Sequence, residues 1–184
     1  MKEYTPGLKG KTYLGFTLIE LLIVIVIIGL LAFVILNFLN PQENMARSRD
    51  AGRISAVTQL GGAINAFYLS NNSTFPSPTD WDTELVSSGH PQNFPAGIKY
   101  KIAGSLACQT NVRPLSTPNY CYDAEASVNN AIVYSILESQ NQKSKCVGSG
   151  SPYFVYSTAD GRGGIVCAVA DPTPWTRGSM TYIN

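Results

Sequence analysis

The sequence predicts an α+β fold, in which a long N-terminal α-helix packs on a C-terminal head built around an antiparallel β-sheet. Three patterns support this prediction. Residues 16–39 form an almost uninterrupted apolar run, residues 54–67 carry apolar side chains at helical spacing, and short runs rich in β-branched and aromatic residues follow residue 100. At 184 residues, the chain has room for one such domain and one membrane segment.

The apolar run at residues 16–39 is long enough to cross a membrane. As a helix it would extend about 36 Å, and a hydrocarbon core is about 30 Å thick. Lys9 and Lys11 precede the run, so the positive-inside rule predicts a cytoplasmic N-terminus and an exported C-terminal region. A secretory signal peptide would have a shorter apolar core and a small-residue cleavage site behind it. A plain signal anchor is the stronger alternative.

Glu20 is the only charged residue in this run. A carboxylate in hydrocarbon costs at least about 2.5 kcal/mol, so such a residue normally has a partner or a task. A plain membrane anchor does not require one. One alternative is that the Glu20 side chain simply extends to the membrane interface.

The junction between the basic leader and the apolar run reads GFTLIE, at residues 15–20. This junction resembles the processing site of type IV pilins and pseudopilins. The resemblance implies that a prepilin peptidase cuts between Gly15 and Phe16 and methylates the new amine of Phe16. Glycine suits the position before the cut because it has no side chain to obstruct a protease groove. The resemblance divides the chain into a leader (1–15), a transmembrane assembly helix (16–39) and an extracytoplasmic pilin head (40–184).

Three more positions match the pattern of this family. Thr17 and Glu20 correspond to its second and fifth mature residues, and Gly29 to a glycine common within the helix. We therefore expect all three to serve assembly. In a polymer of bundled helices the amine of Phe16 would enter an apolar core, where Glu20 of a neighbouring copy could pair with it. An unpaired buried charge would cost about 3–5 kcal/mol.

Beyond Pro41 the pattern becomes amphipathic. One apolar stripe consists of Ile54, Val57, Leu60, Ile64 and Phe67, and the stretch before it is polar, with Arg47, Arg49, Asp50 and Arg53. The pattern predicts a helix that ends near Ser70 and that, together with the apolar run, spans about 55 residues. Many pilins have a proline inside the apolar segment. The first one here is Pro41, so a kink is expected at residues 36–44.

Three glycines in the amphipathic stretch weaken the predicted helix. Gly52, Gly61 and Gly62 each cost about 1 kcal/mol relative to alanine. Either the helix tolerates them, or they permit close contact with a neighbouring element.

The rest of the chain predicts a loop and then a sheet. Residues 76–99 are rich in turn-forming residues, with one short helix expected around residues 80–89 and His90 as an exposed loop residue. Strands are predicted at residues 100–108, 119–124, 131–138, 153–158 and 164–170. The last two flank a glycine-rich hairpin connection. One face of the sheet should cover the helix stripe and the other should be wet.

Four cysteines lie in the C-terminal half of the chain, at Cys108, Cys121, Cys146 and Cys167. Their spacing and the single histidine argue against a structural zinc site. An even number of cysteines beyond a membrane segment indicates disulfides in an oxidising compartment. We favour the pairs Cys108–Cys121 and Cys146–Cys167 because short loops close most easily. Each bridge would stabilise the fold by about 3 kcal/mol; free buried thiols are the alternative.

Asp160 is a weak candidate for calcium binding. The residues STADGRGG, at 157–164, resemble a calcium-binding loop of the major type II secretion pseudopilin. Calcium prefers several carboxylates, however, and Asp160 is the only nearby one before Asp171. Arg162 adds a positive charge that opposes a cation. We therefore predict a plain turn, and no metal or cofactor for the chain.

Composition and motifs argue against nucleic-acid binding and catalysis. The leader contains three of the 13 basic residues and one of the 12 acidic ones, so ten basic and eleven acidic residues remain without it. This near-neutral balance does not indicate a nucleic-acid-binding protein. With one histidine and neither a paired-carboxylate site nor a phosphate-binding glycine loop, the sequence does not predict an enzyme.

The resemblance implies a structural subunit of a type IV pilus, used for adhesion, motility or DNA uptake. The size of the head favours this function over its alternative, a pseudopilin of a type II secretion system. A membrane-tethered enzyme or sensor is a third possibility. The implied partners are other copies of the chain, minor pilins, the prepilin peptidase and an inner-membrane assembly platform. The implied location is the cytoplasmic membrane before assembly and an extracellular pilus afterwards.

Overall fold

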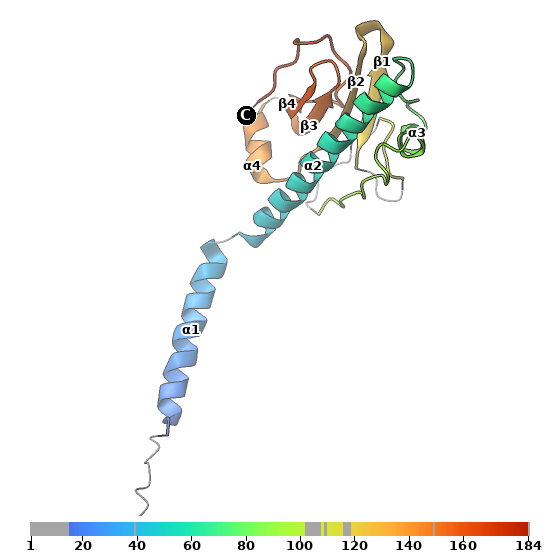
Figure 1. Cartoon of the computed structure of the whole chain (residues 1–184). Helices are drawn as coiled ribbons and strands as arrows, with labels where there is room; N and C mark the ends of the chain where they lie inside the picture. Colours follow the sequence, from blue (N-terminus) through green and yellow to red (C-terminus); the bar gives the residue numbers. More distant parts are fainter. Residues whose placement is uncertain are drawn as a thin grey trace, which may run out of the picture. The chain divides into compact units, whose positions relative to one another are not determined.

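The computed structural model describes residues 15–38, 40–101, 108, 110–115, 119–148 and 150–183, apart from the side chain of residue 37. The leader up to residue 14, including Lys9 and Lys11, lies outside the described residues. The chain divides into two compact units, Met1–Pro41 and Gln42–Asn184. Each unit has its own architecture (Figure 1).

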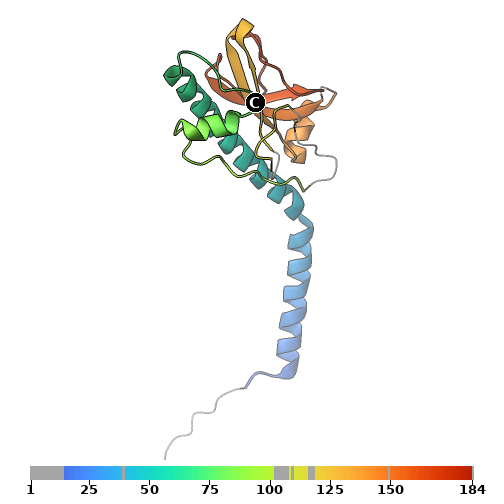
Figure 2. The same cartoon turned by 90° about the vertical axis from the view of Figure 1, so that its right-hand side faces the viewer.

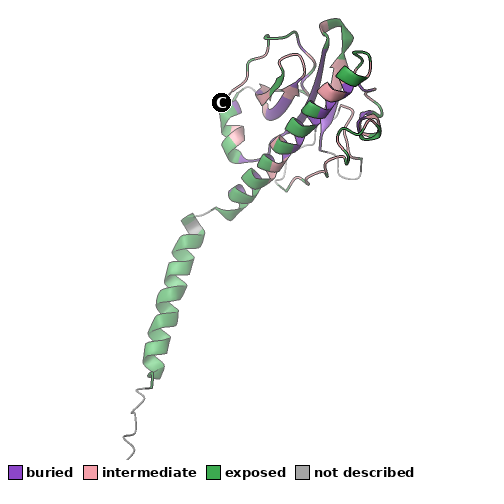
Figure 3. Cartoon of the chain, in the orientation of Figure 1, coloured by how far each residue is buried: buried purple, intermediate pink, exposed green. Residues whose placement is uncertain are grey.

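Helix α1, Leu18–Phe38, is the helical part of the first unit. Its described side chains are exposed on every side, shown in green in Figure 3. The stretch Leu18–Leu36 is long and apolar enough to cross a membrane. A helix that is apolar all round, and that no described part of its own chain covers, needs lipid or other apolar helices around it.

A break after Phe38 separates α1 from helix α2, Pro41–Ser70. The prediction of one continuous helix is therefore wrong, while the interruption falls where a kink was expected. Pro41 has no N–H to donate, and the residue before a proline is pushed out of the helical region. Asn40 accordingly has a φ of 32°. Proline also suits the first position of a helix. Pro41 therefore both interrupts the preceding helix and begins α2.

The second unit combines α2 with a four-stranded antiparallel sheet (Figures 1 and 2). The strands lie in chain order and are β1 (Cys121–Glu125), β2 (Asn130–Ile136), β3 (Ser151–Ser157) and β4 (Arg162–Ala168). The short elements are α3 (Trp81–Ser87), η1 (Ala126–Val128), α4 (Gln140–Lys143) and η2 (Ser144–Cys146). The predicted α+β class and four of the five predicted strands are confirmed. The strand predicted at residues 100–108 is not confirmed. Tyr100, Lys101 and Cys108 are not in a strand, and residues 102–107 lie outside the described residues.

The apolar stripe of α2 packs on one face of the sheet, as predicted. Val57, Leu60 and Ile64 are completely buried in the same cluster as Tyr122 and Val133. Those two sheet residues face the same side because they lie opposite each other on β1 and β2. Burying each aliphatic side chain of this kind contributes about 1.5–3 kcal/mol.

The opposite face of the sheet is also buried, so the prediction that it would be wet is wrong. Ile132, Tyr134 and Val155 on this face are completely buried. Trp175, from the C-terminal segment, and Cys108 complete the same cluster. This cover is irregular chain without apolar periodicity, which is why the sequence pattern did not reveal it.

Asp160, in the turn between β3 and β4, fastens the C-terminal cover. Its carboxylate accepts hydrogen bonds from Trp175 Nε1, the N–H of Gly178 and the hydroxyl of Tyr182, each at 2.8 Å. The guanidinium of Arg162 lies 4.2 Å from the centre of the Tyr182 ring. Burial alone would raise the pKa of Asp160, but the three hydrogen bonds and the nearby arginine lower it. The charged form of Asp160 therefore stabilises the cover.

Arg53 is the centre of a buried charge cluster. The sequence placed it in a polar stretch, but its side chain is completely buried, which corrects that placement. Its Nη1 atom donates to Asp50 at 2.9 Å and to Glu138 at 3.1 Å. Arg49 also donates to Glu138. We call these four residues the Arg53 cluster; its two guanidiniums balance its two carboxylates.

The acidic side chains of α2 also hold the chain that follows β2. The two carboxylate oxygens of Asp50 accept the N–H groups of Glu138 and Ser139, both at 2.9 Å. About two turns earlier in α2, Glu43 accepts the N–H groups of Gln140 and Asn141 at 2.8 and 3.0 Å. Four backbone N–H groups in the chain that leaves the sheet are thus paired with carboxylates of α2.

Gly61 and Gly62 are neighbours in α2 with different surroundings. A Cβ at Gly61 would lie 2.2 Å from the ring of Tyr156, whereas a Cβ at Gly62 would meet no described atom within 4 Å. Close contact between helix and sheet therefore explains Gly61. Simple tolerance explains Gly62.

Alanine substitutions at these two positions should have opposite effects. Gly61→Ala should lower the free energy of unfolding by about 1–3 kcal/mol, because the new methyl group overlaps the Tyr156 ring. Gly62→Ala is the matched control and should raise it by up to about 1 kcal/mol. Chemical unfolding of the full chain in detergent would measure both. A Gly61→Ala chain as stable as the wild type would contradict the close contact.

Acid should loosen the C-terminal cover. Because the pKa of Asp160 is lowered in the folded chain, its contribution is present above the ordinary aspartate pKa of about 3.9 and is lost as the pH falls through the folded pKa. Iodide quenching of Trp175 emission should therefore increase at low pH. Asp160→Asn should already show this increase at neutral pH, because an amide nitrogen cannot accept hydrogen bonds. Asp80→Asn, which changes an exposed loop carboxylate, should behave like the wild type; if Asp160→Asn does too, Asp160 does not fasten the cover.

Candidate processing and assembly site

The predicted cleavage point lies in a non-helical segment directly before α1. Gly15 is exposed, and Phe16 is 81% exposed. A Cβ built on Gly15 would meet no described atom within 4 Å. Exposed chain outside secondary structure is where proteases cut most readily. The bond between Gly15 and Phe16 is thus accessible in this structure.

Thr17 and Glu20 form a capping box at the start of α1. Glu20 Oε2 accepts hydrogen bonds from the N–H of Thr17 at 2.8 Å and from its hydroxyl at 2.7 Å. In return, the N–H of Glu20 points to Thr17 Oγ1 at 3.4 Å. Such a pair satisfies N–H groups that the first turn of a helix leaves without partners. The structure thus brings two of the predicted assembly residues together.

The capping box gives Glu20 a task within its own chain that the sequence analysis missed. The spacing Thr-x-x-Glu before an apolar run is its sequence signature, so the contact could have been predicted. Within the described residues, Thr17 is the only hydrogen-bond partner of the Glu20 carboxylate, and both bonds go to Oε2. The other oxygen, Oε1, keeps its capacity to accept.

Gly29 lies just past the middle of α1, apart from the capping box. A Cβ at this position would meet no described atom within 4 Å. The described residues of this unit therefore offer no packing reason for a glycine. Small residues in membrane helices permit close approach of another helix, which is one reason for a glycine at such a position.

The head contains both predicted disulfides. Cys108 bonds to Cys121 and Cys146 bonds to Cys167, over sequence separations of 13 and 21 residues. The predicted sequential pairing is therefore confirmed. The first bridge ties the loop before β1 to the sheet, and the second ties η2 to β4.

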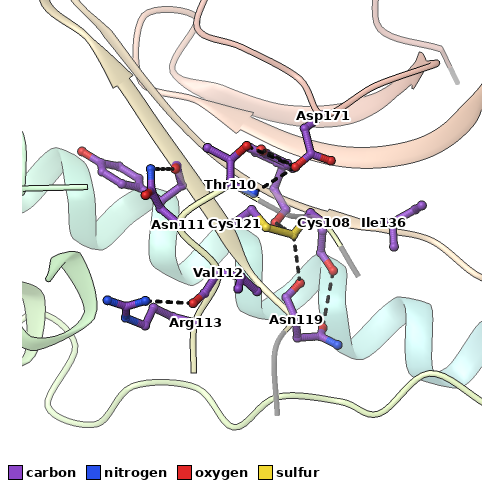
Figure 4. Close-up of a disulfide and its surroundings, with 12 residues drawn as sticks. Cys108, Thr110, Asn111, Val112, Arg113, Asn119, Cys121, Ile136 and Asp171 are labelled. Carbon is purple, nitrogen blue, oxygen red and sulfur yellow. Dashed lines mark hydrogen bonds between the residues drawn. A yellow bond between two sulfur atoms is a disulfide. The ribbon is translucent and has the colours of Figure 1, made fainter. Parts of the chain in front are cut away.

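Asp171 supports the first disulfide loop, as Figure 4 shows. Its Oδ2 atom accepts hydrogen bonds from the N–H and the hydroxyl of Thr110, at 3.0 and 3.2 Å. The hydroxyl of Tyr134 also donates to this oxygen, at 3.3 Å. Cys108 and Cys121 are both buried. Asp171 thus joins the two irregular segments that cover the second face of the sheet.

The structure gives Asp160, the weak calcium candidate, the different task described above. Both of its oxygens already accept hydrogen bonds from the C-terminal segment. Among the residues that the structure describes, no three or more histidine, cysteine or acidic side chains are grouped so that they could hold a metal ion. His90 is exposed, as predicted.

Comparison with known proteins identifies the N-terminal segment. Residues 11–36 match the model of the prokaryotic N-terminal methylation motif. The chain is 34% identical over 95 residues to type II secretion system core protein G of Pectobacterium carotovorum subsp. carotovorum, covering 49% of this chain and 58% of the relative. It is 35% identical over 88 residues to the protein of the same description from Klebsiella pneumoniae, covering 45% and 60%. The chain thus spans less than two thirds of the length of these relatives. No solved structure matches it significantly.

The methylation motif coincides with the accessible junction, the capping box and most of α1. The helix is followed by a second helix packed on an antiparallel sheet, as the sequence resemblance implied. The chain thus carries the prokaryotic N-terminal methylation motif, and over about half of its length it is similar to type II secretion system core protein G.

Proposed function

We propose that this chain is a pseudopilin, a structural subunit that polymerises through α1 as part of a type II secretion system. Both curated relatives are described as type II secretion system core protein G, which favours a pseudopilin over a subunit of a type IV pilus. The observation that carries the proposal is the methylation motif on an apolar helix whose described side chains are all exposed. Its partners would be further copies, the prepilin peptidase and a membrane assembly platform.

The physical basis of polymerisation would be the burial of α1. In the membrane, lipid covers this helix; outside lipid, its apolar surface is stable only against other apolar helices. Copies that leave the membrane together can bundle their α1 helices and keep them away from water. The head, with its own core and two disulfides, would then lie outside the bundle.

A subunit of a type IV pilus is the second candidate. The leader, the capping box and α1 suit both kinds of polymer. About half of this chain lies outside the alignment with the secretion relatives, which cover 49% of it. That remainder could serve a function that the relatives do not have.

Deleting the gene separates the two candidates. A pseudopilin is required for release of secreted proteins, so the deletion strain should retain them and a plasmid copy should restore release. A pilus subunit should instead be the main protein in filaments sheared from wild-type cells. Normal secretion together with lost surface filaments would overturn the pseudopilin proposal.

Replacing Gly15 should block processing without disturbing the fold. Because Gly15 contacts no described atom, Gly15→Leu should leave a folded, membrane-inserted precursor that keeps its leader. Gly29→Ala is the matched control: it also meets open space and should still be cleaved. Mass spectrometry of the membrane fraction would show the N-terminus. A wild-type chain that starts at Met1 would contradict processing at this bond.

Substitutions at Glu20 can separate capping from charge pairing. Glu20→Gln keeps a side chain that can cap the helix but removes the charge. We expect a cleaved, inserted chain that fails to polymerise, because the amine of Phe16 would be buried in the polymer without a counter-charge. Thr17→Val keeps the charge and weakens the cap, so it should polymerise better than Glu20→Gln. Crosslinking of α1 between copies would measure assembly.

The opposite ranking would contradict charge pairing. If Glu20→Gln assembles normally while Thr17→Val does not, capping is the task of Glu20. If both assemble like the wild type, neither task matters for polymerisation.

A further inference from the structure

A hollow of about 330 Å³ lies at the beginning of α2. Gln42, Met45 and Arg49 line it from the helix. Lys101 lines it from the segment 98–101, which is neither helix nor strand. The three helix residues share a face because they are three and seven positions apart. Met45 is 62% exposed, so this apolar side chain stands at the edge of the hollow in contact with solvent.

The segment 98–101 is held beside α2 by several contacts. The carbonyl of Ile98 accepts from Arg53 Nη2 at 3.0 Å, and the ring of Tyr100 lies 3.9 Å from the Arg53 guanidinium carbon. The N–H of Lys101 donates to Glu138 Oε2 at 2.9 Å. These contacts fix the backbone of Lys101 opposite Arg49, while the Lys101 side chain is exposed.

The covalent chain keeps this hollow close to the membrane, however the two units are arranged. Gln42 follows Phe38, the last residue of α1, by four positions. Four residues of extended chain cover at most about 14 Å. The headgroup layer on each side of a bilayer is about 5–7 Å thick, and phosphates lie within it. The Gln42 edge of the hollow therefore lies within reach of lipid headgroups, and Arg49 lies about 10 Å farther along α2.

The charges near the hollow favour an anion. The Arg53 cluster is balanced, and Arg47 pairs with Glu43 at 2.9 Å. Lys99 and Lys101 are exposed, and neither forms an ion pair within the part of the chain that the structure describes. The hollow thus combines one unneutralised ammonium, a partly exposed guanidinium at Arg49 and an apolar edge at Met45.

We propose that this hollow binds the headgroup of an anionic phospholipid from the exported leaflet. Lys101 and the exposed part of Arg49 hold the phosphate, and Met45 packs on the glycerol region. A free anion would make no use of Met45, whereas a lipid uses both the charge and the apolar edge. The inference rests on the membrane anchoring within the proposed function and is independent of polymerisation.

Lipid retention by the full chain in nonionic detergent tests this proposal. Native mass spectrometry should show about fivefold more bound phosphatidylglycerol than phosphatidylcholine at equal concentrations, the preference that one lysine near anionic lipid provides. Lys101→Glu should abolish the preference. Arg177→Glu makes the same charge change at an exposed site near the end of α2, beside Tyr68, and should leave the preference unchanged. Met45→Ser should reduce retention of both lipids.

Three outcomes would overturn the proposal. Equal retention of the two lipids by the wild type is the first, and an unchanged preference in a folded Lys101→Glu chain is the second. The third is displacement of phosphatidylglycerol by inorganic phosphate at equal concentration, which would show a site for free anions. Alkaline extraction of membranes separates this inference from the proposed function. A chain released by alkali contradicts the anchoring, whereas a retained chain without lipid preference contradicts only the lipid site.

Discussion

The head depends on one buried electrostatic interaction, the Arg53 cluster. Arg53 has no exposed surface, so its charge is stable there only with the carboxylates of Asp50 and Glu138 beside it. Removing one partner of such a pair typically costs about 3–5 kcal/mol. The same Asp50 accepts two backbone N–H groups after β2, so neutralising the arginine also positions the chain that leaves the sheet. Charge balance and chain direction are therefore set by the same atoms.

This constraint acts at the first half of α2, and Gly61 acts at the second. The cluster holds α2 against the end of β2, while Gly61 lets the helix approach the ring of Tyr156 on β3. The apolar stripe begins directly after Arg53 and continues past Gly61 to Phe67, so both contacts help to hold its side chains against the sheet. With one face of the sheet fixed in this way, the irregular cover on the other face has a rigid surface on which to pack.

Local patterns in the sequence predicted the parts of the fold that local physics determines. Apolar spacing revealed the stripe of α2, and short loop lengths indicated the cysteine pairing. The missed features depend on partners far apart in sequence. Arg53 is a charged residue at a buried position of α2. Glu138, which explains its burial, lies 85 positions away. Trp175 belongs to no periodic segment, and Asp160 holds it across the fold. The capping box, by contrast, is a local feature, because the pattern Thr-x-x-Glu before an apolar run predicts the contact between Thr17 and Glu20.

The capping box changes the physical problem that Glu20 poses. A carboxylate at the beginning of an apolar helix is costly in hydrocarbon unless something pairs with it. In the single chain, the N–H and hydroxyl of Thr17 already solvate Oε2, and the unpaired N–H groups of the helix start favour a negative charge. Oε1 can still accept, because a carboxylate offers about four lone-pair sites. Under the proposed function, Glu20 would not have to exchange one partner for another on polymerisation. It could keep its cap on Thr17 and add the amine of a neighbouring Phe16, so that no intermediate leaves the carboxylate without a hydrogen bond.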